Sequence, residues 1–413
     1  MVPSRSMAPR WLHSSILGSI ALAVVCGCHS GSTDAYPTWA AEPKGFVPKE
    51  VSSNAYDAYA LAADEAEGKG AAFLDRVSFY PGQKHEAGAA IQDCVQQVLN
   101  ATKKTCDFEF VSHKPFKAVK YQRGWRLIGR AILWTVEDAC QAADYDKAIS
   151  HAVAGTKFGF DLTGGGATDA SLGLGIADDI RKQIAPYLVK MSATQLDTLA
   201  KGMKAALDSK PPISNALKNE QENVLQAIQF LQDSLKGGTL KVVQDGLGPD
   251  VNEAIRYLED LADNPRKRTT YFESLAKAAD IEYAQVAQDS ELPVVSRVKP
   301  NTKNDAPWKK LAKYLYGASR PLLEINDATV ARTRLLILYA EIDRLGLRNK
   351  AYPANLDAFT PGLTIDPYSG SKFLYHADQA EFSIYSVGKN GRDDGGDTDA
   401  TFTQPDLRLE CPT

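Results

Sequence analysis

The chain lacks the sequence motifs that identify the common classes of enzyme active site. It contains no G-x-S-x-G turn around a serine, no H-E-x-x-H pair on a helix and no G-x-x-x-x-G-K-[ST] phosphate loop. Only six histidines occur in 413 residues, and they are scattered. The glycine-rich stretch 162–179 lacks the phosphate-loop lysine and predicts a flexible connection into a helix that begins near Asp169. No catalytic residue is therefore assigned from the sequence.

The chain also lacks an excess of basic residues. It has 47 lysines and arginines against 51 aspartates and glutamates, which gives a formal net charge of −4. Proteins that bind nucleic acids usually present a basic face to the phosphate backbone. The longest basic cluster, residues 266–268, is short and follows Pro265, as expected for the solvated start of a helix. The sequence thus predicts no nucleic-acid partner.

A long hydrophobic run is missing as well. The most apolar segment, ILGSIALAVVCGC, is too short to span a bilayer stably, and Arg5 and Arg10 precede it. A positive start followed by a short apolar core is typical of a secretory signal peptide. Residues 25–28 (VCGC) resemble a bacterial lipobox, so residues 1–27 are predicted to be a lipoprotein signal peptide and Cys28 to receive lipid. The alternative is an ordinary signal peptide with incidental cysteines.

Residues 28–47 are predicted to form a flexible tether, because the segment after Cys28 is polar and contains glycine, serine and proline. Acyl chains on Cys28 would hold the exported protein at a membrane of the cell envelope, facing the periplasm or the exterior. The expected partners are this membrane, through the N-terminal lipid anchor, and an envelope protein that the sequence does not identify.

Four of the six cysteines follow Cys28, namely Cys94, Cys106, Cys140 and Cys411. They show no C-x-x-C spacing, which argues against a zinc site. In an oxidising compartment, four cysteines suggest two disulfides, and three connectivities are open. The first pair of cysteines flanks the polar turn NATKKT and could close a short loop. Elimination would then pair the remaining two.

Residues 48–320 are predicted to form an all-helical body. In GWRLIGRAILWTVEDA (124–139) and NVLQAIQFLQDSLKGG (223–238), apolar residues recur at helical spacing. Gly237-Gly238 is expected to stop the second of these helices. Stretches rich in proline and charge, such as DSKPPIS and DNPRKR, separate the helical segments.

Residues 321–413 are predicted to form a small α+β module, with a long helix followed by an antiparallel sheet. RTRLLILYAEIDRLG carries the helical stripe. After Lys350, KFLYHA (372–377) and EFSIYSVG (381–388) alternate apolar and polar residues as strands do, and DLRLE (406–410) is a third candidate strand. The predicted fold class is therefore mainly α, with a C-terminal sheet.

Four aspartates crowd the turn after the second strand: Asp393, Asp394, Asp397 and Asp399. Like charges this close repel unless water or a cation screens them. Calcium takes about six to eight oxygen ligands, and the glycines of this turn let a loop fold back so that oxygens converge. The residue order of an EF-hand is absent. Composition alone is compatible with two interpretations, a solvated turn or a calcium site.

Short elements near the end of the chain occur in a defined order: Tyr352-Pro353 with Leu356, Asp366-Pro367 with Gly370, Tyr375, and Tyr385-Ser386-x-Gly388 before the acidic turn. Together they resemble the C-terminal region of the major pseudopilin of type II secretion. In that family the turn joins the final strands and holds calcium, so the resemblance implies a calcium ion at the four aspartates. A pseudopilin begins with a hydrophobic helix that packs into a filament, whereas a lipobox and a helical body precede the module here.

These observations predict a lipid-anchored bacterial envelope protein with a non-catalytic scaffold or binding role and a calcium-stabilised, pseudopilin-like C-terminal module. One alternative is an envelope hydrolase whose active groups meet only in the fold, which a deep pocket lined by ionisable residues would favour. Another is a solute-binding lipoprotein with two lobes, although the predominance of helix over alternating strand–helix units argues against it.

Overall fold

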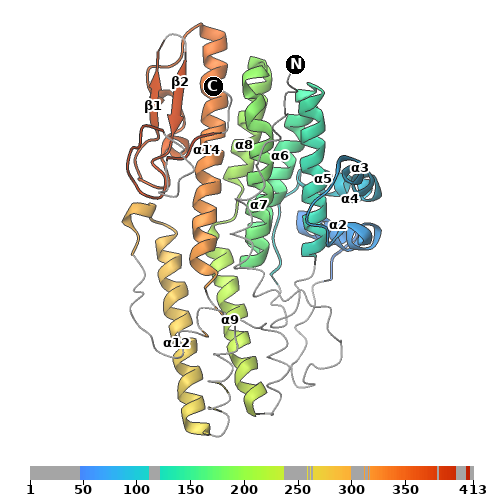
Figure 1. Ribbon diagram of the computed structural model, residues 1–413, viewed down its shortest axis with the longest axis vertical. Helices are drawn as coiled ribbons and strands as arrows, with labels where there is room; N and C mark the ends of the chain where they lie inside the picture. Colours follow the sequence, from blue (N-terminus) through green and yellow to red (C-terminus); the bar gives the residue numbers. More distant parts are fainter. Residues whose placement is uncertain are drawn as a thin grey trace, which may run out of the picture.

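A computed structural model describes residues 47–110, 121–236, 264–298, 317–378, 381–396 and 406–409, together with residues 258, 261, 311 and 315. The described part is mainly helical, with a small antiparallel sheet near the C-terminus (Figure 1). The mainly helical fold class is therefore confirmed. The predicted signal peptide and the lipidation site Cys28 lie outside the described residues.

The body of the molecule is built from helices α2, α4, α5, α6, α7, α8 and α14, which pack on one another. They span Ala55–Lys69, Gln92–Ala101, Gln122–Gln141, Tyr145–Asp161, Ala167–Ile184, Ala193–Asp208 and Ser319–Asn349. Figure 1 shows α2, α4 and the short helix α3 (Pro81–Ala90) grouped beside α5. Short 3-10 turns lie at Ala71–Phe73 (η1), Leu162–Gly164 (η2), Ala185–Lys190 (η3), Val294–Ser296 (η5) and Leu356–Ala358 (η6).

Several helices begin at residues whose side chains cap them. The hydroxyl oxygen of Ser192 accepts a hydrogen bond from the N–H of Gln195, whose side chain accepts in return from the N–H of Ser192, at the start of α8. Asn54 and Asp144 accept from backbone N–H groups at the starts of α2 and α6. Such caps satisfy donors that have no partner within the helix. Local sequence therefore fixes where these helices begin.

The predicted apolar stripe of α5 lies at the centre of the main hydrophobic core. Trp125 and Ile132 are fully buried, and Trp125 Nε1 donates to the carbonyl oxygen of Tyr59 in α2 at 2.9 Å. Where α6 crosses α7, Gly159 faces Gly173. A Cβ on either glycine would clash with the carbonyl oxygen of the other. Glycine at this crossing therefore allows the two backbones to approach closely.

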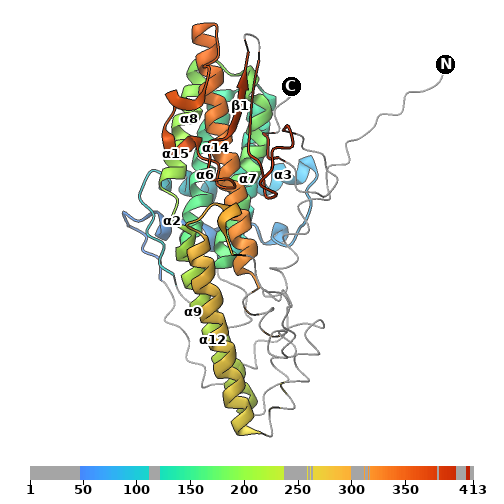
Figure 2. The ribbon, with the colours of Figure 1, turned by 90° about the vertical axis from the view of Figure 1, so that its left-hand side faces the viewer.

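Helices α9 (Ile213–Lys236) and α12 (Pro265–Asp289) pack side by side and form an arm that extends away from the body (Figure 2). A second hydrophobic core fills the arm, with Leu231 and Tyr283 almost completely buried in it. Helix α9 runs to Lys236, directly before the two glycines that the sequence predicts to stop it. The arm thus follows from two long amphipathic helices that bury their apolar faces against each other.

The glycine-rich turn before α7 is buried and is not a flexible connection. Helix α7 begins at Ala167, whose N–H donates to Glu220 Oε2 of α9 at 3.0 Å, while the N–H of Gly166 donates to Asp169 Oδ2 at 3.2 Å. Gln122 Nε2 donates to Asp169 Oδ1 at 2.9 Å. Burial raises the pKa of Asp169 to about 6. The chain's own carboxylates therefore fill the place where a phosphate loop would hold its ligand.

Helix α14 belongs to both hydrophobic cores. Leu322 and Leu323 near its start lie in the arm core, whereas Leu335 and Ile342 lie in the main core. The sequence groups this helix with the C-terminal module from residue 321 onward, but in the structure it packs against α7 and α8 of the body. The reason is that several sides of α14 are apolar, so it is covered by neighbours on more than one side.

Strands β1 (Leu374–Ala377) and β2 (Phe382–Tyr385) form the predicted antiparallel pair. The third candidate strand, 406–410, makes only one bridge in the part of it that is described, between Ser386 and Leu407. The described sheet therefore has two strands, with a single residue pair extending it.

The sheet lies along the end of α14 (Figure 1). The ring of Phe382 in β2 packs on Tyr339 of α14, with ring centroids 4.7 Å apart. Arg334 of α14 donates to the carbonyl oxygen of Ile365 at 2.7 Å. The short helix α15 (Pro361–Thr364) precedes this carbonyl. Aromatic packing and a charge-assisted hydrogen bond thus attach the module to the body.

Asp366 is the central polar residue of the module. Its carboxylate, 1% exposed, accepts the hydroxyl of Ser386 at 2.9 Å and the N–H groups of Tyr368 and Val387 at 2.9 and 3.2 Å. Burial raises the pKa of Asp366, and these hydrogen bonds act in the opposite direction. Two of the motifs that carry the pseudopilin resemblance, at residues 366 and 386, are therefore in direct contact.

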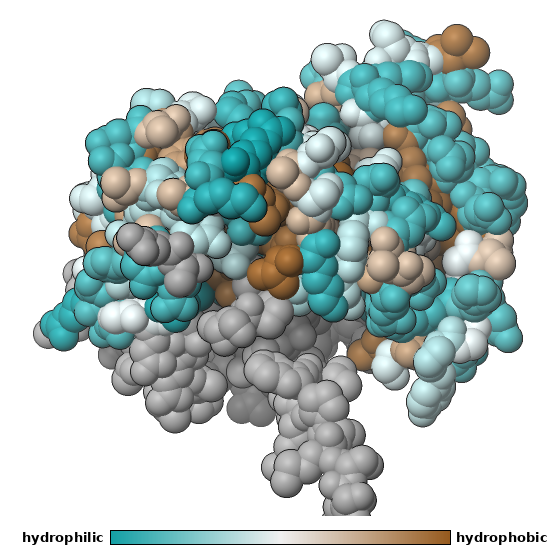
Figure 3. Space-filling model, turned by 90° about the horizontal axis from the view of Figure 1, so that it is seen from above, coloured by the Kyte–Doolittle hydropathy of each residue, from teal (hydrophilic) through white to brown (hydrophobic). Residues whose placement is uncertain are grey.

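The surface seen from above is mostly hydrophilic where the structure describes it, with small separate hydrophobic areas (Figure 3). Val51 and Val77 are among the most exposed large apolar side chains. Within the described ranges, no helix combines the length and the apolar character needed to cross a bilayer.

Candidate functional site

Two of the four predicted calcium ligands, Asp393 and Asp394, lie in the described part of the turn after β2, and both are exposed. Asp393 Oδ1 accepts the hydroxyl of Tyr385 at 3.1 Å and the N–H of Gly395 at 2.9 Å. Asn390 Nδ2 donates to Asp394 Oδ2 at 2.7 Å. The structure brings both carboxylates into one turn, where each already accepts hydrogen bonds from neutral donors.

A further carboxylate, which the sequence does not single out, lies beneath this turn. Asp406 is 1% exposed, and its Oδ2 accepts the N–H groups of Asp394 at 3.0 Å and Gly396 at 2.7 Å. Its Oδ1 is buried and has no hydrogen-bond partner in the described structure. Burial raises the pKa of Asp406. The single bridge between Ser386 and Leu407 brings Asp406 next to the turn. Because Asp406 is about ten residues away from the turn in sequence, the sequence alone does not indicate this contact.

The backbone of the acidic turn requires glycine. Gly395 and Gly396 both have a φ of 73°, a conformation that residues with a side chain rarely adopt. Arg408 packs against Gly396, and its guanidinium lies 5.1 Å from the ring centroid of Tyr385. Its Nη2 also lies 3.4 Å from the carbonyl oxygen of Gly395, so Arg408 covers one side of the turn.

The described residues alone do not complete a metal site. No group of three or more His, Cys, Asp or Glu side chains within them lies close enough together to hold an ion. Asp397 and Asp399 lie outside the described residues. Asp406 contacts the turn through the N–H of Asp394, and its buried Oδ1 is a carboxylate oxygen of the kind that calcium prefers. Calcium binding stays a prediction.

Cys94 and Cys106, the pair that the sequence suggests could close a short loop, are both free cysteines in the structure. Cys94 lies beside Glu65 in the second half of α2. The residue before Cys106 pairs with the start of α2, where the N–H of Ala55 donates to the carbonyl oxygen of Thr105 at 2.9 Å. A helix rises about 1.5 Å per residue, which separates these two positions of α2 by about 15 Å. Disulfides join Cα atoms about 4.4–6.8 Å apart.

Cys140 is also a free cysteine in the structure, and its predicted partner Cys411 lies outside the described residues. Burial raises the pKa of Cys94 and that of Cys140 to about 11. Both thiols are therefore protonated at neutral pH and behave as small apolar side chains in the core.

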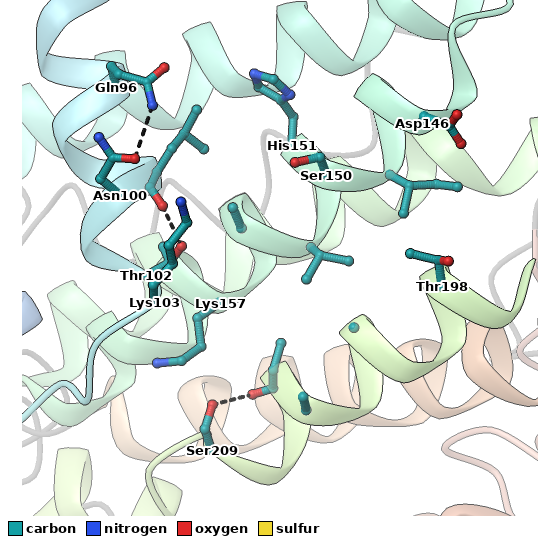
Figure 4. A pocket seen from close by; sticks show the side chains of 17 residues that line it. Gln96, Asn100, Thr102, Lys103, Asp146, Ser150, His151, Lys157, Thr198 and Ser209 are labelled. Carbon is teal, nitrogen blue, oxygen red and sulfur yellow. Dashed lines mark hydrogen bonds between the residues drawn. The ribbon is translucent and has the colours of Figure 1, made fainter. Parts of the chain in front are cut away.

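A pocket of about 730 Å³ opens between α4, α6 and α8 (Figure 4). Pockets for small molecules commonly measure about 300–1,000 Å³. Apolar side chains form much of its lining, including Ile149, Val153 and Ala154 of α6 and Ala205 and Ala206 of α8. The sequence did not reveal this pocket, because only the packing of three separate helices creates it.

Small residues of α8 make the hollow. A Cβ on Gly202 would lie 2.5 Å from Cγ2 of Val153, so glycine lets α8 approach α6 while leaving space beside it. Neutral polar side chains complete the lining: Gln96, Asn100, Thr102, Ser150, Thr198 and Ser209. The pocket therefore combines an apolar floor with a polar rim.

Charged groups lie at opposite ends of the pocket, with Lys103 and Lys157 near one end and Asp146 at the other (Figure 4). Lys157 Nζ contacts the two carboxylate oxygens of Asp161 at 2.5 and 2.7 Å. Asp146 Oδ1 accepts from Gln195 Nε2 at 3.0 Å. No carboxylate among the described residues forms an ion pair with Lys103. Among the described residues, therefore, no acidic partner offsets the charge of Lys103, whose side chain is exposed.

His151 and Ser150 also line the pocket. His151 Nδ1 lies 2.9 Å from the carbonyl oxygen of Lys147, an oxygen that can only accept a hydrogen bond. The described structure contains no hydrogen bond between Ser150 and His151. The residues therefore offer polar contacts, and their geometry is not that of a serine nucleophile activated by a histidine.

Comparison of the chain with protein-family models, curated proteins and solved structures gave no match. The resemblance to pseudopilins thus rests on the short C-terminal motifs alone. The acidic turn and the pocket, which lie in different parts of the molecule, are the two candidate functional sites.

Proposed function

We propose that this chain is a lipid-anchored bacterial envelope protein whose helical body has a non-catalytic binding or scaffold role. The observation that carries the proposal is the sequence of the N-terminus, in which two arginines, a short apolar core and VCGC at 25–28 precede a polar segment. Lipid on Cys28 would keep the helical body at the membrane surface.

The pocket between α4, α6 and α8 supports a binding role for the body. Its volume and its apolar floor suit a small ligand. It lies between three helices of one body and not in a cleft between two lobes, which favours a helical binding protein over the two-lobed alternative. Ionisable residues line the pocket, which is what the hydrolase alternative predicts, but Ser150 and His151 form no hydrogen bond with each other that would make a nucleophile and its base.

For the C-terminal module we propose a pseudopilin-like role of the acidic turn, in which calcium stabilises the fold. The residues that would hold the ion are Asp393 and Asp394, the two aspartates outside the described residues, and Asp406. The support is the buried Oδ1 of Asp406, which lacks a hydrogen-bond partner where a cation would provide one.

The anchor is tested by membrane fractionation of cells that express the full chain. Cys28→Ser, or treatment with globomycin, is expected to release the protein from membranes, because no acylated cysteine would remain. Cys26→Ser is the matched control and should stay membrane-bound. A Cys28→Ser protein that still fractionates with membranes would contradict the proposal.

Calcium binding is tested by calorimetric titration of the purified chain with calcium and, separately, with magnesium. Binding of calcium is expected in the wild type and is expected to be lost in the double variant Asp393→Ala, Asp394→Ala. Asp406→Asn should weaken it, since the buried oxygen would lose its charge. Asp357→Asn, at an exposed aspartate of the same module, is the control. A module whose melting does not respond to calcium or chelator would remove calcium from the proposal.

A further inference from the structure

We propose that the pocket between α4, α6 and α8 binds a small amphipathic anion, in which one carboxylate or phosphate group is attached to a short apolar body. The inference rests on the proposed binding role of the helical body but does not depend on the lipid anchor or on calcium. It assigns a ligand chemistry to a site that the sequence did not predict.

The apolar part of the ligand follows from the floor of the pocket. Ile149 and Val153 of α6 line the pocket together with Ala206 of α8, and the exposed Ala205 also contributes to the lining. Water in contact with such a floor makes few hydrogen bonds, so an alkyl or aromatic group that displaces it is favoured. The floor therefore favours a ligand with an apolar body, and it provides no hydrogen-bond partners for a highly polar ligand such as a sugar.

The sign of the ligand's charge follows from the balance of ion pairs. Lys157 is paired with Asp161, a buried carboxylate that also accepts the hydroxyl of Tyr59 at 2.8 Å. Lys103 has no such partner among the described residues and lies at the same end of the pocket (Figure 4). An anion bound there would meet one uncompensated ammonium group close to a second, paired one.

Neutral donors at the rim fit the same assignment. Gln96 Nε2 donates to Asn100 Oδ1 at 3.2 Å, which orients the amide of Asn100 and leaves its Nδ2 group to donate to a ligand. A cationic ligand would have to use Asp146 at the far end, whose Oδ1 already accepts from Gln195. The arrangement of charges and donors therefore favours a head group that accepts hydrogen bonds, held near α4.

Photoaffinity labelling of the full chain tests the proposal, because it reports where a probe binds. The probe is octanoic acid with a diazirine in its alkyl chain, and the labelled peptides are identified by mass spectrometry. We expect labelling on α4, α6 and α8 that competes with octanoate and with octyl phosphate. Competition by both would show that the anionic group is what is recognised, and preference for one would identify its source as carboxylate or phosphate.

Matched variants separate the two parts of the recognition. Lys103→Ala is expected to weaken octanoate competition about tenfold, whereas Lys104→Ala, at the neighbouring lysine that donates to the carbonyl oxygen of Ser52 and does not line the pocket, should leave it unchanged. Ala205→Trp places a large side chain at an exposed position of the lining and should abolish labelling. Circular dichroism establishes that each variant is folded.

Three results would overturn the inference. They are labelling outside these helices only, equal labelling by the neutral octanol analogue of the probe, and labelling that survives Ala205→Trp in the folded protein. None of these results bears on the anchor, which the fractionation of the Cys28 variants tests separately.

Discussion

The helical body and the C-terminal sheet are stabilised in different ways. In the body, side chains such as Trp125 and Ile132 are buried between helices, and glycines set the closest approach of α6 and α7. In the sheet module, two buried carboxylates, Asp366 and Asp406, organise the chain by accepting hydrogen bonds from backbone and hydroxyl groups. Burial of apolar side chains stabilises the body, whereas hydrogen bonds to buried carboxylates stabilise the module.

This difference has a physical reason. Long helices satisfy their own backbone hydrogen bonds, so only their side chains need partners. A two-stranded sheet with long turns leaves many backbone N–H groups unpaired, and a small module has little apolar surface to offset them. A buried carboxylate can accept hydrogen bonds from several of these N–H groups. The stability of the module therefore depends on the charge of these carboxylates.

The largest expected effect is a cavity in the body. Ile132→Ala should lower the free energy of unfolding by about 2–5 kcal/mol, because it removes a fully buried side chain from the main core. Urea unfolding followed by far-ultraviolet circular dichroism measures it. Val77→Ala, at a side chain that is 88% exposed, is the control and should change stability by no more than about 0.5 kcal/mol. Similar losses in both variants would contradict the proposed role of the core.

A pH effect of nearly the same size is expected at Asp169 in the body. The pKa of Asp169 is raised from 3.8 to about 6, mainly by burial, so the folded state holds its proton more tightly than the unfolded state. Its contribution to stability is complete below pH 3.8 and is lost as the pH rises to about 6, a fall of about 3 kcal/mol. Unfolding titrations across this range measure it, and Asp169→Asn should remove this part of the pH dependence. An unchanged profile in that variant would refute the assignment.

In the module, Asp366→Ala should cost about 1–3 kcal/mol, because it leaves the buried hydroxyl of Ser386 and the N–H groups of Tyr368 and Val387 without an acceptor. The effect should be local. Hydrogen exchange measured by mass spectrometry is expected to rise in the two strands while exchange in α5 stays slow. Asp357→Ala, at an exposed aspartate, is the matched control. Faster exchange throughout the body would show that the two regions unfold as one unit.

The smallest expected effect is at the surface between the two regions. Lys389 Nζ lies 2.8 Å from Glu324 Oε1 of α14, and both side chains are about half exposed. A double-mutant cycle to alanine should give a coupling energy below about 1 kcal/mol, since solvent screens the pair. Phe382→Ala, which removes the ring that packs on Tyr339, should cost more than either single change. The reverse order would mean that charge, and not aromatic packing, attaches the sheet.

The sequence predicted what depends on local periodicity. The apolar stripes at 124–139 and 223–238 became α5 and α9, and the alternating segments after residue 371 became the strand pair. Cys94 and Cys106 lie near opposite ends of α2, a separation that twelve residues of sequence spacing does not reveal. The turn before α7 looked flexible from its glycines, but the carboxylate of Glu220, more than fifty residues away, accepts its backbone N–H group.

The sequence by itself determined the mainly helical class, the positions of α5, α9 and the strand pair, and the signals that predict export and lipid attachment, because each depends on residues close together in the chain. Only the tertiary structure decided that α14 joins the body, that Asp406 lies beneath the acidic turn, and that α4, α6 and α8 enclose a pocket that Lys103 also lines. Those features come from contacts between segments that are distant in sequence. Such contacts depend on how the shapes and charges of side chains fit together in three dimensions, and local sequence patterns do not show this.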